Sequence, residues 1–184
     1  MNLFDHILFA DLRLAEWILN LRTMFLDKFF LEVTYWGNWQ VILFLCLLFS
    51  ILFYFNKKKY LILPLFVSVI GAGVMTVIIK YIVGRARPNP EIALYVEKLP
   101  SFPSAHSALI FSLFGFLFYS ICRSNLDYKI KFTLSVVVVF IIIIVGFSRL
   151  YLGVHFLSDV LAGYLVGLMW VLTSMYISRK NIFK

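Results

Sequence analysis

Long apolar runs alternate with short charged segments along this chain. Five runs carry almost no charged residue and occupy residues 33–56, 60–79, 107–122, 132–147 and about 155–177. Because a helix needs ~20 mainly apolar residues to cross a bilayer, each run is long enough, or nearly so, for one transmembrane helix. The pattern predicts an all-α, polytopic membrane helical bundle with about five transmembrane helices.

Residues 1–32 have a different pattern, in which charged and apolar residues are mixed. The apolar residues recur at roughly helical spacing: Phe4, Ile7, Leu8, Leu14, Ile18 and Leu21. This spacing predicts an amphipathic helix in the membrane interface, and a helix packed on the bundle outside the membrane fits it equally well. Asp5, Asp11 and Glu16 do not fit the basic start and apolar core of a cleaved signal peptide.

The composition also indicates a membrane protein. Hydrophobic residues make up 62% of the chain and charged residues 14%, whereas a soluble globular chain is nearer half apolar and a quarter charged. We expect a single domain over residues 1–184, with a transmembrane core over 33–178 and a basic tail over 179–184. Cys46 and Cys122 lie within or at the end of apolar runs and are expected to be packing residues, not a disulfide or a catalytic thiol.

The net charge of +8 is concentrated on one side of the predicted bundle. If the five runs alternate in direction, one set of loops carries a single acid, Asp127, and these basic residues: Lys57, Lys58, Lys59, Arg123, Lys129, Lys131, Arg179, Lys180 and Lys184. The other set carries basic and acidic residues in equal number. The positive-inside rule therefore predicts that the first set of loops, together with the C-terminus, lies in the cytoplasm. No basic patch with interleaved aromatic residues lies outside the runs, so nucleic acid is not expected as a partner.

Small residues predict close contacts between helices in two of the runs. Gly71 and Gly73 lie in the second run, and Ala162, Gly163 and Gly167 lie in the last. Such residues let helix backbones approach closely within a membrane.

Three polar clusters interrupt the apolar pattern, and all fall on the side opposite the excess positive charge. They are Lys80 with Arg87-Pro88, Pro103-Ser104-Ala105-His106, and Ser148-Arg149 with His155 and Asp159. Polar groups at membrane depth are costly and are commonly functional. We therefore expect the three clusters to meet in one site.

Lys80, Arg87 and Arg149 are the cations of these clusters. Any one of them alone fits a side chain that extends to lipid head groups, and this ordinary role is expected for the nearby Arg85. Three cations from separate segments fit a phosphate dianion, because Arg supplies a bidentate fork and Lys a compact point charge.

Ser104 follows a proline and precedes an apolar run, which predicts a helix N-cap. Capping by itself needs no further role. The start of a helix also presents free backbone N–H groups and the positive end of the helix dipole, which bind anions. Ser104 and the amides of Ala105 and His106 are therefore candidate phosphate ligands.

His155 and Asp159 are four residues apart, so they face the same way on a helix. Such a pair is often only a helix contact. A carboxylate that accepts from one imidazole nitrogen can also leave the other nitrogen free as a nucleophile. His106 would then serve as the general acid for the leaving oxygen. The third histidine, His6, is expected to be interfacial.

Together, the three clusters resemble the signature motifs of the type-2 phosphatidic acid phosphatase superfamily. That superfamily includes membrane lipid phosphatases and soluble vanadium haloperoxidases. The motifs occur in the family's order between Lys80 and Asp159, and the first 79 residues carry none of them. Ala105 departs from the pattern, since the family usually has Gly there, but the backbone N–H donor is kept.

The resemblance implies a role for each residue. His155 attacks phosphorus to form a phosphohistidine, Asp159 orients His155, and His106 protonates the leaving group and later takes a proton from water. The implied ligands of the phosphoryl oxygens are Lys80, Arg87, Ser104, the Ala105 amide and Arg149. No metal or organic cofactor is implied, because the cations supply the positive charge that Mg²⁺ supplies elsewhere.

The resemblance further implies a membrane lipid phosphatase in a bacterial-type inner membrane, with its site on the extracytoplasmic face. Undecaprenyl diphosphate is the substrate that we expect, and phosphatidylglycerol phosphate, phosphatidic acid and a lipid A phosphate are the alternatives. The loop 89–99, with Glu91, Glu97 and Lys98, is expected to influence the choice of head group.

Three other functions fit parts of the pattern. A phosphotransferase would pass the phosphoryl group to a second lipid in place of water. A metal-binding transporter would use His106, His155 and Asp159 as ligands, but neighbouring cations repel a metal ion. A structural bundle without a site would require three polar clusters to meet on one face by coincidence.

Overall fold

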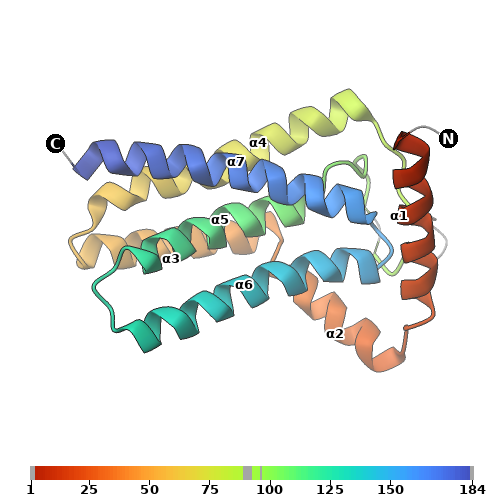
Figure 1. Cartoon of the computed structure of the whole chain (residues 1–184), viewed down its shortest axis with the longest axis horizontal. Helices are drawn as coiled ribbons and strands as arrows, with labels where there is room; N and C mark the ends of the chain where they lie inside the picture. The colour runs from red at the N-terminus through yellow and green to blue at the C-terminus, as the bar shows by residue number, and fades with distance from the viewer. Residues whose placement is uncertain (1–2, 89–92, 96, 183–184) are drawn as a thin grey trace.

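Helix α5 (Ala105–Cys122) lies at the centre of the structure and is the most buried of its membrane-length helices. Four helices pack around it: α3 (Trp39–Phe55), α4 (Ile62–Val83), α6 (Tyr128–Tyr151) and α7 (Leu157–Ile182). Figure 1 shows these helices running along the long axis of the molecule. Successive helices run in opposite directions, so the connections between them gather at the two ends.

Two further helices precede this bundle, α1 (Leu3–Leu19) and α2 (Met24–Tyr35), and the short 3₁₀ helix η1 (Lys59–Leu61) leads into α4. The computed structural model describes residues 3–88, 93–95 and 97–182. All regular elements within these ranges are helices, which confirms the predicted all-α membrane bundle.

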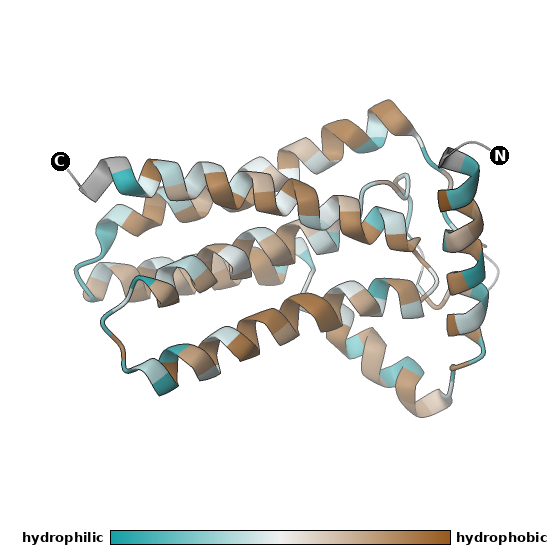
Figure 2. Cartoon of the chain, in the orientation of Figure 1, coloured by the Kyte–Doolittle hydropathy of each residue, from teal (hydrophilic) through white to brown (hydrophobic). Residues whose placement is uncertain are grey.

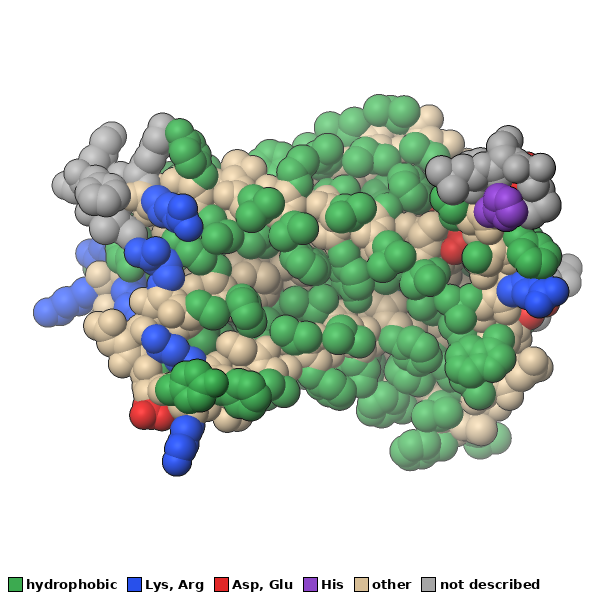
Figure 3. All heavy atoms as spheres, viewed as in Figure 1, with side chains coloured by type: hydrophobic (Ala, Val, Ile, Leu, Met, Phe, Trp, Pro, Cys, Tyr) green, Lys and Arg blue, Asp and Glu red, His purple; other side chains and the backbone are tan. Residues whose placement is uncertain are grey.

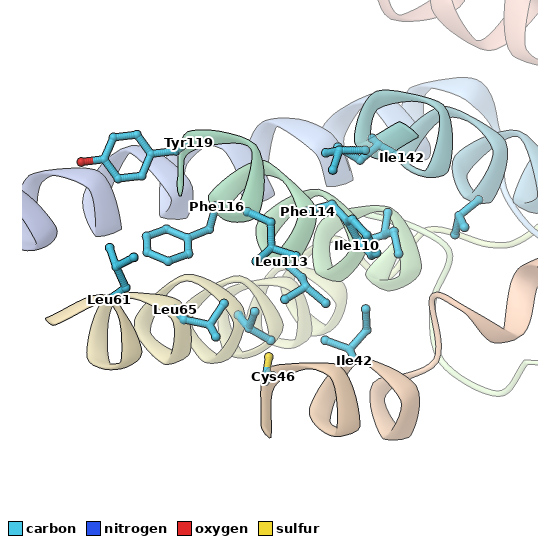
Figure 4. Packing of buried hydrophobic residues seen from close by; sticks show 14 residues of the cluster. Ile42, Cys46, Leu61, Leu65, Ile110, Leu113, Phe114, Phe116, Tyr119 and Ile142 are labelled. Carbon is cyan, nitrogen blue, oxygen red and sulfur yellow. The ribbon is translucent and has the colours of Figure 1, made fainter. Parts of the chain in front are cut away.

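The main hydrophobic core is built around α5 (Figure 4). Ile110, Leu113 and Phe116 of this helix have no exposed surface, and they belong to one buried cluster with side chains of α3, α4 and α6. Cys46 of α3 is part of the cluster, so it is a packing residue as predicted. The same prediction is wrong for Cys122, which is exposed at the end of α5.

Glycines allow α7 to approach α5 closely. A Cβ atom on Gly163 would lie 2.5 Å from the Ser104 carbonyl oxygen, and one on Gly167 would lie 2.8 Å from the Ala108 carbonyl oxygen. The small-residue face predicted for the last run is therefore confirmed at these two positions. On α4, Gly71 meets an indole ring of α7 in a similar way.

Four helical segments are long and apolar enough to cross a membrane: Lys59–Val83, Ala105–Cys122, Tyr128–Tyr151 and Leu157–Arg179. Helices α2 and α3 add a fifth if the pair, which is bent by 51°, is taken as one broken span. Figure 2 shows the apolar residues along these helices and the polar residues nearer the ends of the bundle. The predicted first span, 33–56, is not one continuous helix, because a turn at residues 36–38 separates α2 from α3.

Helix α1 lies across one end of the bundle (Figure 1). It buries Asp11 and Ile18, and its exposed residues include large apolar ones (Ile7, Leu8, Phe9, Leu12 and Trp17) together with His6, Arg13 and Glu16. Exposed apolar residues mixed with charged ones favour a position in the membrane interface over one in water. The predicted amphipathic segment 1–32 is thus two helices, and the second extends beyond it to Tyr35.

The two ends of the bundle differ in charge. Figure 3 shows Lys and Arg side chains gathered at the end opposite α1. This end holds the α3–α4 and α5–α6 connections and the C-terminal part of α7, which carry the basic residues named above. Lys184 of that set lies outside the described residues. The α4–α5 and α6–α7 connections, with the three polar clusters, lie at the other end as expected.

We predict that Gly163→Ala destabilises the protein. The added methyl group would lie 2.5 Å from a backbone oxygen of α5, so the two helices would have to separate. Overpacking of this kind costs ~1–3 kcal/mol. Thermal unfolding in detergent should show a lower midpoint, and phosphate release should fall because the start of α5 is displaced.

Gly73→Ala is the matched control. A Cβ atom on Gly73 would have Leu109 as its nearest neighbour at 3.5 Å, an ordinary contact, so the close approach predicted there is wrong. We expect this variant to unfold at or above the wild-type temperature. Equal midpoints for the two alanine variants would contradict the role assigned to Gly163.

Candidate functional site

The three polar clusters meet beside a cavity of about 450 Å³ at the α1 end of the bundle. Lys80, Ala105 and His106 are among the residues that line it. Trp39 and Leu99 also line the cavity and are largely exposed, so it opens at the surface. Its volume is in the range of pockets that bind small molecules, ~300–1,000 Å³.

Lys80 brings a buried ammonium group to this cavity from the last turn of α4. Only 2% of the side chain is exposed. Its Nζ donates to the carbonyl oxygens of Pro100, at 2.5 Å, and Ser101, at 3.2 Å. An ammonium group has three N–H donors, so Lys80 retains a donor for a further ligand.

Arg87 reaches the site because α4 ends one turn after Lys80. Gly84 adopts the left-handed conformation that terminates the helix, with φ of 61°, and the chain then turns back over the bundle. Arg87 Nε donates to the Leu99 carbonyl oxygen at 2.9 Å, and Nη1 donates to the Val154 carbonyl oxygen at 2.7 Å. Arg87 thereby links the α4–α5 connection to the α6–α7 connection.

Arg149 is the most deeply buried cation, with no exposed surface. From the last turn of α6, its Nη1 donates to Thr34 Oγ1 and its Nη2 to Glu97 Oε1. The guanidinium lies over the Tyr95 ring, 5.6 Å from its centroid. In the described part of the chain, its Nε has no hydrogen-bond partner. A buried guanidinium with an unused donor is suited to receive an anion.

Ser104 caps α5 as predicted, since its side chain accepts from the Ser107 amide. Its own backbone N–H donates to the Asp159 carbonyl oxygen at 2.9 Å, which ties the start of α5 to the first turn of α7. Ala105 is the first residue of α5 and borders the cavity. The amide at this position is among the first N–H groups of the helix, which have no partner within it.

His155 and Asp159 form the predicted pair, at the junction of the α6–α7 connection and α7. His155 Nδ1 lies 3.4 Å from Asp159 Oδ2, which also accepts from the Phe156 amide at 3.0 Å. His155 Nε2 points the other way and lies 3.3 Å from Arg87 Nη1. If Nδ1 carries the proton, Nε2 has its lone pair directed toward the cations.

His106 lies in the first turn of α5 and lines the cavity. Its Nε2 is 2.7 Å from Asn38 Oδ1, a contact that sequence analysis missed. Its Nδ1 is 3.9 Å from Glu97 Oε1, whereas His155 Nε2 is 3.9 Å from Glu97 Oε2. Each of the two imidazoles therefore lies near a different oxygen of the same carboxylate.

Glu97 lies among the cations, although sequence analysis gave it no specific role. Its carboxylate accepts from Arg87 Nη2 at 2.5 Å and from Arg149 Nη2. Nothing in the spacing of the loop residues indicates this position. Glu91, the other acid of the predicted head-group loop, lies outside the described residues.

The cations also change the pKa values of two loop residues in the site. Burial lowers the pKa of His155 well below its ordinary value of 6.5, and Arg149 lowers it further, although Glu97 acts in the opposite direction. Burial alone would raise the pKa of Glu97, but Arg149, His155, Arg87 and Lys80 together bring it below its ordinary value. At neutral pH, His155 is therefore uncharged and Glu97 is ionised.

Arg85 does not extend to lipid head groups, so that prediction is wrong. Its Nη1 donates to Asp159 Oδ1 at 2.6 Å, and its Nη2 donates to Asp11 Oδ2 at 2.9 Å. Asp11 also accepts from the Ser158 amide at 3.0 Å. Helix α1 is thus linked through Arg85 to the carboxylate that contacts His155. The motif spacing singled out Arg87 and gave no reason to include its neighbour.

The site thus combines a neutral imidazole, a second imidazole, two buried cations, Lys80 and Arg149, and the half-buried Arg87. Within the ranges that the structure covers, no three His, Cys, Asp or Glu side chains are grouped so that they could hold a metal ion. The chemistry that suits this set is nucleophilic attack on a bound phosphoryl group.

The chain is similar in sequence to known proteins. The family model described as "PAP2 superfamily" matches residues 61–183. Phosphatidylglycerophosphatase B of Bacillus subtilis (strain 168) is 29% identical over 163 residues, which cover 87% of this chain and 79% of the relative.

Two solved structures have a similar fold. The crystal structure of the first transmembrane PAP2 type phosphatidylglycerolphosphate phosphatase from Bacillus subtilis superposes with a TM-score of 0.87 and 25% identity, covering 95% of this chain and 87% of that chain. Aquifex aeolicus LpxE superposes with a TM-score of 0.71 and 27% identity, covering 91% of this chain and 95% of that chain.

We predict that Asp11→Ala lowers both stability and activity. The change removes the acceptor of Arg85 Nη2 and of the Ser158 amide, and an unsatisfied donor of this kind costs ~1–3 kcal/mol. Arg85 would also be free to shift against Asp159. Thermal unfolding and phosphate release, measured on the same preparation, test the two effects.

Glu16→Ala on the same helix serves as the control, because Glu16 is exposed. It should behave as the wild-type protein does. If the Asp11 and Glu16 variants have the same unfolding temperature and the same activity, the link from α1 to Asp159 contributes to neither stability nor activity.

Proposed function

The chain belongs to the PAP2 superfamily, and on that premise we propose that it hydrolyses a lipid phosphate through a phosphohistidine formed on His155. One observation carries this proposal. The Nε2 atom of His155 faces Arg87, whereas Nδ1 faces Asp159. The lone pair of a neutral imidazole is thus directed into the cation cluster, where a phosphoryl group would be held.

The first step forms a bond between His155 Nε2 and phosphorus. As the bond from phosphorus to the leaving oxygen breaks, His106 donates a proton to that oxygen, which departs as an alcohol or as a shorter phosphate. Asp159 accepts from His155 Nδ1–H and stabilises the positive charge that develops on the ring. The negative charge on the phosphoryl oxygens is offset by these groups: Lys80, Arg87, Arg149, Ser104 and the Ala105 amide.

The second step restores the enzyme. His106, now neutral, takes a proton from a water molecule, whose oxygen attacks phosphorus. The bond between phosphorus and His155 Nε2 breaks, and inorganic phosphate leaves. Asn38 Oδ1 lies 2.7 Å from His106 Nε2 and can accept a hydrogen bond from Nε2–H in both steps. This contact would keep Nδ1 of His106 turned toward the phosphate.

The substrate that we propose is a membrane lipid carrying a phosphomonoester or diphosphate. Phosphatidylglycerol phosphate is the first to test, because the similar sequence and one of the similar structures, both from Bacillus subtilis, are described as phosphatases of that lipid. Undecaprenyl diphosphate, expected from the sequence, remains a prediction for the same assay. We place the site on the extracytoplasmic face and the C-terminus in the cytoplasm, since the basic residues gather at the other end.

Two other functions make different predictions in the same assay. A phosphotransferase would release little free phosphate until an acceptor lipid is added. A metal-binding transporter would lose its function in excess chelator, whereas hydrolysis that relies on Lys80, Arg87 and Arg149 should continue there.

We predict that the purified protein releases phosphate from at least one member of a panel of phosphatidylglycerol phosphate, undecaprenyl diphosphate, phosphatidic acid and lipid A phosphate. His155→Ala should abolish this release, because it removes the proposed nucleophile, and the variant should still fold by thermal unfolding. Ordinary turnover by His155→Ala would refute the nucleophile assignment. Failure of the wild type on every lipid, with and without an acceptor, would refute the function.

We also predict that the acidic limb of kcat/KM lies below pH 6.5. His155 attacks only as the neutral base, and burial together with Arg149 holds its pKa below that value, so the active form persists as the pH falls through it. The profile must be corrected for the second ionisation of the substrate phosphate, whose pKa is ~6. A corrected limb at or above the ordinary histidine value would contradict the proposed nucleophile.

A further inference from the structure

We propose that Glu97 is an internal competitor for the phosphate site: its carboxylate occupies the phosphoryl position and must leave before a substrate binds. This inference rests on the proposed function and goes beyond it, because it assigns a role in selectivity to a residue outside the three motifs. The carboxylate contacts Arg87 and Arg149, and both imidazoles face its two oxygens.

The contacts of Glu97 are those expected of a bound phosphate. Carboxylates and phosphates both accept hydrogen bonds from guanidinium groups through two oxygens. Here one oxygen accepts from Arg87 at 2.5 Å and the other from Arg149. His155 Nε2, the proposed nucleophile, lies 3.9 Å from the first oxygen. A phosphoryl group cannot lie between these residues while the carboxylate is there.

The cations do not depend on Glu97 for their positions. Arg87 also donates to two backbone carbonyl oxygens, and Arg149 also donates to Thr34 Oγ1. Lys80 is held by two further carbonyl oxygens. Each anchor would remain if Glu97 turned away, so the site would keep its shape and gain net positive charge.

The cavity beside Glu97 offers space for a second position of its side chain. Glu97 borders the cavity of about 450 Å³, and 18% of its side chain is exposed, whereas Arg149 is fully buried. A rotation about its side-chain bonds toward the cavity would remove the carboxylate from the cations. The ionised state of Glu97, described above, is the state that competes with another anion.

This arrangement favours ligands that carry more charge than a carboxylate. A phosphomonoester carries about −1.5 to −2 at neutral pH, so it gains more from the three cations than Glu97 does. A phosphodiester carries a single charge and matches the carboxylate. Glu97 would therefore keep the abundant phosphodiester lipids of a membrane out of the site, and would also weaken the binding of the product phosphate.

The test compares Glu97→Gln with wild type, using inorganic phosphate as the probe. Glutamine keeps the shape of the side chain and removes the charge. We expect at least a tenfold lower dissociation constant for phosphate by calorimetry in detergent, and a matching fall in its inhibition constant during turnover. Phosphatidylglycerol, a phosphodiester, should inhibit the variant more strongly than it inhibits wild type.

Glu32→Gln is the matched control, because Glu32 is an exposed glutamate on α2 near the same end of the bundle. It should leave phosphate binding unchanged. An unchanged or weaker affinity of Glu97→Gln for phosphate would overturn the inference, and so would unaltered inhibition by phosphatidylglycerol. Weaker affinity with lower kcat/KM would instead make Glu97 part of substrate binding.

Two further measurements distinguish failure of this inference from a folding defect and from failure of the proposed function. If Glu97→Gln does not fold, Glu97→Ala is measured in the same way, and failure of both variants to fold would make Glu97 a structural ion-pair partner and overturn the inference. The calorimetric comparison needs no turnover. A wild-type protein that binds phosphate but hydrolyses no lipid would refute the function while the comparison still decides the role of Glu97.

Discussion

The burial, whole or partial, of three cations at one end of a membrane bundle is the constraint on which the site depends. A charged side chain removed from water must find polar partners nearby, or folding becomes unfavourable. Here most of the partners are neutral: backbone carbonyl oxygens for Lys80 and Arg87, and a threonine hydroxyl for Arg149. Neutral acceptors fix the positions of the cations without cancelling their charge. The electrostatic attraction for an anion is therefore preserved.

The carboxylate of Asp159 is shared between two functions, one on each oxygen. Oδ2 is the oxygen nearer to His155, whereas Oδ1 accepts from Arg85. Because Arg85 is also paired with Asp11, the orientation of the proposed catalytic pair is tied to the first helix of the chain. The family match covers residues 61–183, so this support comes from a segment outside it. A helix that carries no motif can still be part of the catalytic framework.

Much of the fold and of the site followed from the sequence. Charge-free runs predicted the transmembrane helices because the bilayer excludes charge, and a proline followed by Ser104 predicted the start of α5. The break between α2 and α3 was not predicted, since residues 36–38 carry no charge to interrupt the run. Asn38 and Glu97 reach the site only through that break and through a loop path, neither of which leaves a periodic signal in the sequence.

The position of α1 also bears on how a substrate would arrive. This helix lies across the end of the bundle and exposes both large apolar and charged residues, so it would rest at the depth where lipid head groups begin. The two imidazoles lie at the same end, and a lipid could reach them by lateral diffusion without leaving its leaflet. The encounter is then two-dimensional. Its frequency depends on the mole fraction of the lipid in the membrane, not on a concentration in water.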